Sequence, residues 1–169
     1  MHASEGPPPS QPGSVDALSI RARAAVGAVC VRRYASVHGI EHPAIDELIE
    51  YLFALGSADN IMWWEQHAPL LARTMGCALP AEVAQVVGPQ RTVAFSRLCE
   101  EVLEIGYCDL YGATTDGSKR HLLAAFQMLQ ADQIALPDLT PFLVSSFSKW
   151  HGWGDVVAAD VVDRWRALE

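Results

Sequence analysis

The sequence has few charged residues and no long apolar run, and each shortage excludes a class of protein. Charged residues make up 19% of the chain, below the usual share of about 25%, while hydrophobic residues make up 50%. Such a composition is neither disordered nor fibrous. The longest apolar run, AAVGAVCV at 24–31, is too short to span a bilayer. We therefore expect a folded, soluble, cytoplasmic protein that does not enter membranes.

The short motifs that mark common catalytic and cofactor sites are missing. The sequence contains no GxSxG nucleophile elbow, no P-loop, no GxGxxG and no Glu-x-x-His. Ser148, His151 and Asp155 have the residue types of a nucleophilic triad, but such triads are normally assembled from distant segments. We therefore expect no metal, no cofactor and no catalytic residues, which favours a non-enzymatic protein.

The four cysteines show no CxxC pair and no neighbouring histidine that would complete a zinc site. Each cysteine lies in an apolar stretch, and no secretion signal precedes them, so free thiols buried in the core are favoured over disulfides. The four positions are Cys30, Cys77, Cys99 and Cys108.

Positive charge is scarce over most of the chain. The formal net charge is −8 and the sequence pI is about 5.1. Residues 1–40 carry four arginines against two acids, so the remainder has a net charge of about −10. An acidic field repels phosphate backbones and anionic lipid heads and attracts cationic proteins. We expect no binding to nucleic acid or membranes, and a protein partner, if there is one, to be basic.

The first 14 residues differ in composition from the rest. MHASEGPPPSQPGS is rich in proline and glycine and has neither a basic start nor an apolar stretch, so we expect a flexible tail and not a targeting peptide. Residues 15–169 are long enough to bury one substantial core, which predicts a single helical domain.

Helical periodicity, interrupted by proline and glycine, runs through the chain. A helix capped by Ser14 or Asp16 is expected to end at Gly39, and Pro43 is expected to begin the next, with Gly56 as its terminator. Further helices are predicted over 57–67, after Pro69, after Pro80, over 90–112, after a Ser118 cap, at Pro141 and after an Asp155 cap.

Strand alternation is convincing nowhere, although FLVSSFS at 142–148 has the composition of a short extended piece. In the last helix Asp160 and Arg164 have the spacing of an ion pair. The patterns together predict an all-α fold, an irregular multi-helix bundle of about seven helices with short Pro/Gly turns.

The helical wheel assigns environments to three arginines and one acid. Arg21 and Arg32 are expected to face away from the core, whereas Arg33 falls close to the apolar arc of its helix. Asp109 lies at the margin of the apolar face of 90–112, where it either ends the helix in an Asx-type turn or needs a charged partner. A buried Arg33–Asp109 ion pair is the alternative, either structural or as the floor of a site.

Two tryptophans stand close together in SSFSKWHGWGDVV, residues 145–157. Trp150 and Trp153, with His151 between them, either fill the gap between the last two helices or anchor a partner, because tryptophan dominates both cores and interfaces. The structural role is favoured, since apolar neighbours and a capping Asp155 surround the pair.

Two functional hypotheses follow. The first is a non-enzymatic protein-protein interaction domain, a small acidic inhibitor or immunity-like protein that binds a basic partner. The alternative is a small-ligand-binding protein or an enzyme with an inter-helix pocket. A sizeable apolar cavity in which a histidine meets Asp109 would favour the alternative. Its expected lining is Trp63, Trp64, Met62, Tyr111 and Trp150, with His67 or His151 as the polar group. A homodimer built on a tryptophan patch is a third possibility.

Overall fold

The architecture is helical throughout the part of the chain that the computed structural model describes, residues 15–169. The predicted tail, residues 1–14, lies outside the described residues. No β-strand occurs within 15–169, where an isolated bridge joins Leu18 to Ser146 in the stretch expected to be extended. The predicted all-α bundle is confirmed. The helices are α1 (Ile20–Val37), α2 (Pro43–Ser57), α3 (Ile61–Gln66), α4 (Leu70–Arg73), α5 (Ala81–Val87), α6 (Thr92–Tyr107), α7 (Gly117–Ala131) and α8 (Ala159–Arg166), with short 3-10 turns η1 (Val15–Ala17), η2 (Thr140–Phe142) and η3 (Trp150–Gly152).

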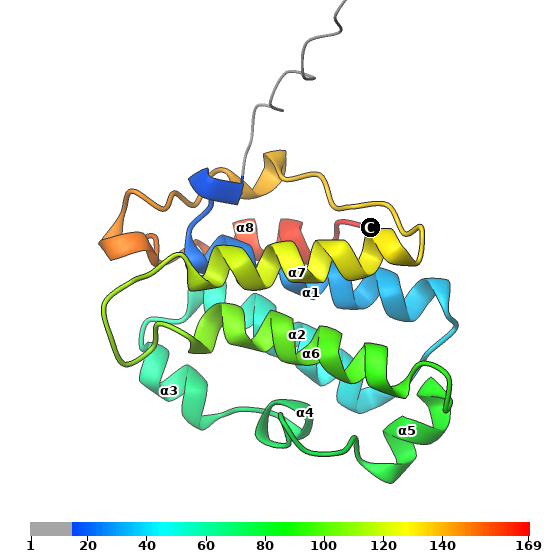
Figure 1. Ribbon diagram of the computed structural model, residues 1–169. Coiled ribbons are helices and arrows are strands. Elements are labelled where there is room, and N and C mark those ends of the chain that lie inside the picture. Colours follow the sequence, from blue (N-terminus) through cyan, green and yellow to red (C-terminus); the bar gives the residue numbers. More distant parts are fainter. Residues whose placement is uncertain (1–14) are drawn as a thin grey trace, which may run out of the picture.

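Helix α1 lies at the centre and contacts α2, α6 and α7 (Figure 1). Fourteen of its 18 residues are buried, because alanine, valine and glycine predominate on every side of it. A Cβ at Gly27 would stand 3.1 Å from the Val102 side chain of α6, so the small residues permit a close helix crossing. A helix that is apolar all round requires neighbours on all sides, and the bundle supplies them.

Several helix ends follow the local signals of the sequence. Gly39 adopts φ +63° just after α1, a left-handed conformation that glycine reaches without strain. Pro43 is the first residue of α2, and the His42 ring accepts a hydrogen bond from the Ala44 amide at 3.1 Å. Asn60 caps α3 by accepting from the Trp63 amide at 3.0 Å. The exposed Asp160–Arg164 pair forms at 3.0 Å, as predicted.

Other predicted caps are wrong, because distant segments use those residues differently. Helix α1 is capped by Ser19, which accepts from the Ala22 amide at 3.0 Å. Gly56 lies inside α2 as a buried residue and does not end that helix. Ser118 is buried within the first turn of α7. Asp155 caps nothing, because Val157 donates to a carbonyl of α2, at Gly56, and α8 begins only at Ala159.

The chain after α7 returns along the outside of the bundle to the end where α1 begins (Figure 1). On this path, Phe142 of η2 packs against Trp165 of α8, with ring centroids 5.2 Å apart. The Trp165 Nε1 donates a hydrogen bond to the Pro141 carbonyl. This return path brings residues 145–157 next to the α6–α7 loop and α3. Within residues 15–169, none of the helices combines the length and apolar character that a membrane-spanning segment needs.

All four cysteines are free, as predicted, but only two are buried. Cys30 and Cys99 lie in the core, whereas Cys77 and Cys108 are exposed, so their predicted burial is wrong. Cys77 follows α4 in a connection at the edge of the bundle, and Cys108 stands just past the end of α6. Short apolar stretches in connections cannot be distinguished from core segments by composition alone.

The thiols should therefore react in a fixed order. Burial raises the pKa of Cys30 to about 12, and partial burial together with Asp109 and Glu104 raises that of Cys108 to about 11. Because the thiolate is the nucleophile, we expect iodoacetamide at pH 8 to modify Cys77 first and Cys108 much more slowly. The Cys108 rate should rise about tenfold per pH unit between pH 7 and pH 9.5. Peptide mapping by mass spectrometry measures each rate, and fast labelling of Cys30 in folded protein would contradict the burial described.

Candidate ligand pocket

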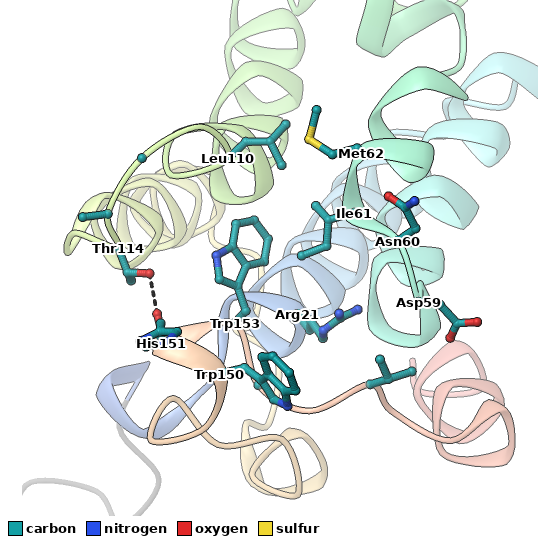
Figure 2. A pocket seen from close by; sticks show the side chains of 14 residues that line it. Arg21, Asp59, Asn60, Ile61, Met62, Leu110, Thr114, Trp150, His151 and Trp153 are labelled. Atoms are coloured by element: carbon teal, nitrogen blue, oxygen red, sulfur yellow. Dashed lines mark hydrogen bonds between the residues drawn. The ribbon is translucent and has the colours of Figure 1, made fainter.

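A pocket of about 720 Å³ opens at the end of the bundle where α1 begins. Three segments surround it: the start of α3, the α6–α7 loop and the stretch 150–156 (Figure 2). Arg21, from the first turn of α1, completes the wall. Most of the lining is apolar. The lining residues are Arg21, Asp59, Asn60, Ile61, Met62, Leu110, Gly112, Ala113, Thr114, Trp150, His151, Trp153, Gly154 and Val156.

The tryptophan-bearing wall is fastened to the start of α1. The Ser19 amide donates to the Ser145 carbonyl at 3.0 Å, and the two serine hydroxyls lie 2.6 Å apart in a buried contact. Phe147 donates its amide to the Ala17 carbonyl at 3.0 Å. Because Ser19 also caps α1, the wall and the helix start share one hydrogen-bond network.

The backbone of that wall is left-handed over several residues. Trp150 and His151 have φ +47° and +53°, and Gly152 and Gly154 have φ +94° and +82°. A bulky residue in this region costs on the order of 1–3 kcal/mol, so the surrounding contacts must hold the turn. One such contact runs from the Thr114 hydroxyl to the His151 carbonyl (Figure 2).

This turn separates the roles of the two tryptophans. Trp153 is partly buried and packs against the core, in the position expected of a side chain that fills the corner. Trp150 is 70% exposed at the rim of the pocket. His151 lines the pocket beside them and is itself exposed. Of the two indoles, Trp153 therefore packs against the core and Trp150 does not, and the alternative role of the stretch, as an anchor for a partner, stays a prediction.

Arg21 is buried, with 4% of its surface exposed, so the prediction that it faces away from the core is wrong. Within residues 15–169 its side chain donates from Nη1, to the carbonyls of Leu55 at 2.5 Å, Ala58 at 2.8 Å and Gly56 at 3.5 Å. Its Nε is buried and has no hydrogen-bond partner. Burial lowers the pKa of Arg21, while Asp59 and Asp155 act in the opposite direction.

Arg23, two residues further along α1, is also buried, with 2% exposed. It donates to the Val15 carbonyl from Nε at 3.1 Å and to the Ser118 hydroxyl from Nη1 at 2.7 Å. Its guanidinium lies 4.6 Å from the centroid of the Phe147 ring. Arg23 thus joins η1, α7 and the segment that carries the tryptophans.

Sequence reasoning missed both buried arginines, although α1 held a signal. A helix that is apolar on all sides is enclosed, and polar residues in its first turns are then enclosed with it. The helical wheel also placed Arg32 wrongly, on the face away from the core. It is partly buried and donates to the carbonyls of Arg166 and Leu168 near the end of the chain.

The predicted Arg33–Asp109 ion pair is wrong. Arg33 donates to the Ala135 carbonyl at 2.8 Å and to the carbonyl of Glu169. Asp109 is buried and accepts from the amide of Thr115 at 3.1 Å and from its hydroxyl at 2.8 Å. The carboxylate therefore shapes the α6–α7 loop through a residue six positions further on, which is not the local Asx-type turn given as the other possibility. The helix does end before Asp109, at Tyr107. The two residues belong to different ends of the bundle.

The other aromatic candidates do not line this pocket. Trp63, Trp64 and His67 surround a separate hollow of about 430 Å³. Trp64 is buried, stacks on Tyr51 at 4.3 Å and donates from Nε1 to its carbonyl, which are structural contacts. Trp63 is 58% exposed and stacks on His67 at 3.8 Å. Tyr111, also exposed, donates its hydroxyl to Glu65.

Few titratable side chains line the pocket. The titratable side chains in the pocket lining are those of Arg21, Asp59 and His151, and Asp59 stands on the far wall from His151 (Figure 2). Among the residues described, no three histidine, cysteine, aspartate or glutamate side chains gather as metal ligands would. Comparisons with protein-family models, with curated proteins and with solved structures found no match for the chain.

The close contact between Gly154 and α1 predicts a large effect of one methyl group. A Cβ on Gly154 would stand 2.6 Å from the Ser19 Cβ and 2.8 Å from the hydroxyls of Ser19 and Ser145. Gly39 has a similar left-handed φ but open space around it. We expect Gly39→Ala to lose about 1 kcal/mol of unfolding free energy, and Gly154→Ala to lose about 1–3 kcal/mol more because the overlap is added to the strain. Urea titrations of both variants measure the difference, and equal losses would refute the contact.

Proposed function

We propose that this protein binds a small, largely apolar molecule in the pocket between α3, the α6–α7 loop and the tryptophan-bearing wall. The observation that carries the proposal is the cavity itself. Its volume of about 720 Å³ falls in the range of about 300–1,000 Å³ that is typical of ligand sites. Ile61, Met62, Leu110 and Trp153 supply apolar walls, and a few polar groups stand among them, as in most such sites.

Binding without catalysis agrees better with the polar groups than an enzymatic reaction does. The arrangement expected for a small-ligand-binding protein or an enzyme was a cavity in which a histidine converges with Asp109, and the structure has the cavity without that convergence. His151 is present, but Asp109 is turned into the α6–α7 loop, where Thr115 occupies its carboxylate. A general base needs its orienting partner within hydrogen-bond reach, and His151 has no carboxylate partner among residues 15–169.

A fluorescent probe tests the proposal directly. N-phenyl-1-naphthylamine is neutral and apolar, and its emission rises when it leaves water. We expect the wild-type protein to bind it with micromolar affinity and Ala113→Trp, which adds a bulky side chain to the pocket lining, to weaken binding at least tenfold. Titrations with direct excitation of the naphthyl group measure both values.

The matched control adds the same side chain elsewhere. Val144 is 67% exposed and does not line the pocket, so Val144→Trp should bind the probe like the wild type. Thermal unfolding of both variants verifies that they fold. No binding by the wild type, or equal binding by Ala113→Trp, would refute a ligand pocket at this place.

A basic protein partner remains the second candidate, and the exposure of Trp150 favours it. The indole stands at the rim of a pocket that exposed Val156 and Met62 also line, and tryptophan is common among the residues that dominate protein interfaces. An inhibitor or immunity-like role stays a prediction that rests on the acidic charge of the chain.

Two matched substitutions test this candidate. If a protein partner docks on the rim, Trp150→Ala should weaken its capture from the native host at least tenfold, while Trp63→Ala, also an exposed tryptophan, should leave capture unchanged. Quantitative mass spectrometry of captured proteins gives the ratio. Equal capture by both variants would exclude the rim as the docking surface, and a mass of two chains in light scattering would indicate a homodimer instead.

A further inference from the structure

Arg21 brings a positive charge to the wall of the pocket without a carboxylate to neutralise it. Within residues 15–169, no carboxylate oxygen lies within ion-pair distance of its guanidinium, and its hydrogen bonds go to neutral carbonyl groups. Charged side chains with so little exposed surface are normally paired, because removing a charge from water is costly. The Arg21 site is therefore electrostatically incomplete.

The carbonyl contacts neutralise only part of the charge. Leu55 and Gly56 belong to the last turn of α2, so Arg21 caps that helix at its negative end. A helix end carries roughly half an elementary negative charge. About half of the positive charge of the Arg21 guanidinium is thus not balanced by the end of α2.

The donors that remain are those that a carboxylate prefers. Because the hydrogen bonds run from Nη1, the edge formed by Nε and Nη2 has no partner among the described residues. This edge matches the two oxygens of a carboxylate or the oxygens of a sulfonate or phosphate. Nε is covered by neighbouring atoms, so an anion pairs with this edge only when those atoms move aside.

Two acids, Asp59 and Asp155, act on the charge of Arg21. In Figure 2 the guanidinium lies between the two tryptophans and Asp59, whose carboxylate points away from the indoles. Asp59 and Asp155 are exposed, so water and salt screen their attraction for Arg21. The two carboxylates weaken the electrostatic attraction between Arg21 and an anion, but they do not form hydrogen bonds with the Nε and Nη2 edge.

We infer that the ligand is a small apolar acid, whose anionic group pairs with the free edge of Arg21 while its apolar body lies against Trp153, Ile61 and Leu110. The inference rests on the proposed function, because it names the ligand class of the same pocket. A purely polar anion would leave the apolar walls without contacts, and a purely apolar molecule would leave the buried cation uncompensated.

A pair of probes that differ in one anionic group tests this. 8-Anilinonaphthalene-1-sulfonate has the aromatic body of N-phenyl-1-naphthylamine plus a sulfonate. We expect Arg21→Met to weaken binding of the sulfonate probe at least tenfold and to change that of the neutral probe less than twofold. Fluorescence titrations of both probes on each folded protein give the ratio.

A second variant avoids the structural role of Arg21. Asp59→Asn removes a nearby negative charge without touching the arginine, so it should strengthen sulfonate binding two- to fivefold and leave the neutral probe unchanged. Glu41→Gln is the matched control, because it removes the same charge beyond the opposite end of α2, roughly 20 Å away. It should change neither affinity.

The outcomes separate the two proposals. If the neutral probe does not bind the wild type, the ligand pocket itself is refuted. If the neutral probe binds and Ala113→Trp blocks it, but sulfonate affinity is the same in wild type, Arg21→Met and Asp59→Asn, the pocket stands and the anionic ligand is refuted. Where Arg21→Met does not fold, Asp59→Asn against Glu41→Gln decides.

Discussion

The burial of two arginines in the first turns of α1 is the constraint on which this end of the protein depends. Each guanidinium has to find hydrogen-bond acceptors, because a buried cation without them is far too costly. Arg21 finds them at the end of α2, and Arg23 finds them at η1 and α7. Segments distant in sequence are thereby fixed around the start of one helix, and the pocket opens beside Arg21 at this end of the bundle.

The tryptophan-bearing wall uses the same anchor. Ser19 caps α1 and at the same time holds Ser145, and Gly154 approaches Ser19 so closely that no side chain fits there. The left-handed turn at Trp150 and His151 stays in place because both of its flanks are attached to α1. Rigid attachment on both sides turns an otherwise strained loop into a stable wall, which is what a preformed ligand site requires.

Local chemistry made much of the fold predictable. Proline at the start of α2, asparagine before α3 and glycine after α1 act through their own backbone and neighbours, so their effect does not depend on the rest of the molecule. Caps that failed, such as Asp155, did so because a distant carbonyl of α2 holds the following residues out of the helix. A hydrogen bond to a distant segment cannot be predicted from the few residues around a helix end.

The candidate site was predictable only in part, for the same reason. Trp150, His151 and Trp153 are neighbours in sequence, and their shared location followed from that. The division of the aromatic residues between two hollows depends on the path of α3, which turns Met62 to one side and Trp63 to the other. The prediction that Arg21 faces solvent rested on a helical wheel, which assumes that one face of the helix is exposed. Helix α1 has no such exposed face at this end, because its residues there are buried on all sides.

The distribution of charge has a consequence for any ligand that reaches the pocket. The chain has 12 basic and 20 acidic residues, and Arg21, Arg23 and one acid, Asp109, are buried in the bundle. The charges that remain on the outer surface are therefore negative in sum, and they repel free anions at long range. An apolar acid crosses that barrier because the walls of the pocket contribute binding free energy that a bare phosphate or sulfate cannot obtain. The proposed preference for an acid with an apolar body thus combines three features: a cation at the pocket wall, an apolar lining and an acidic outer surface.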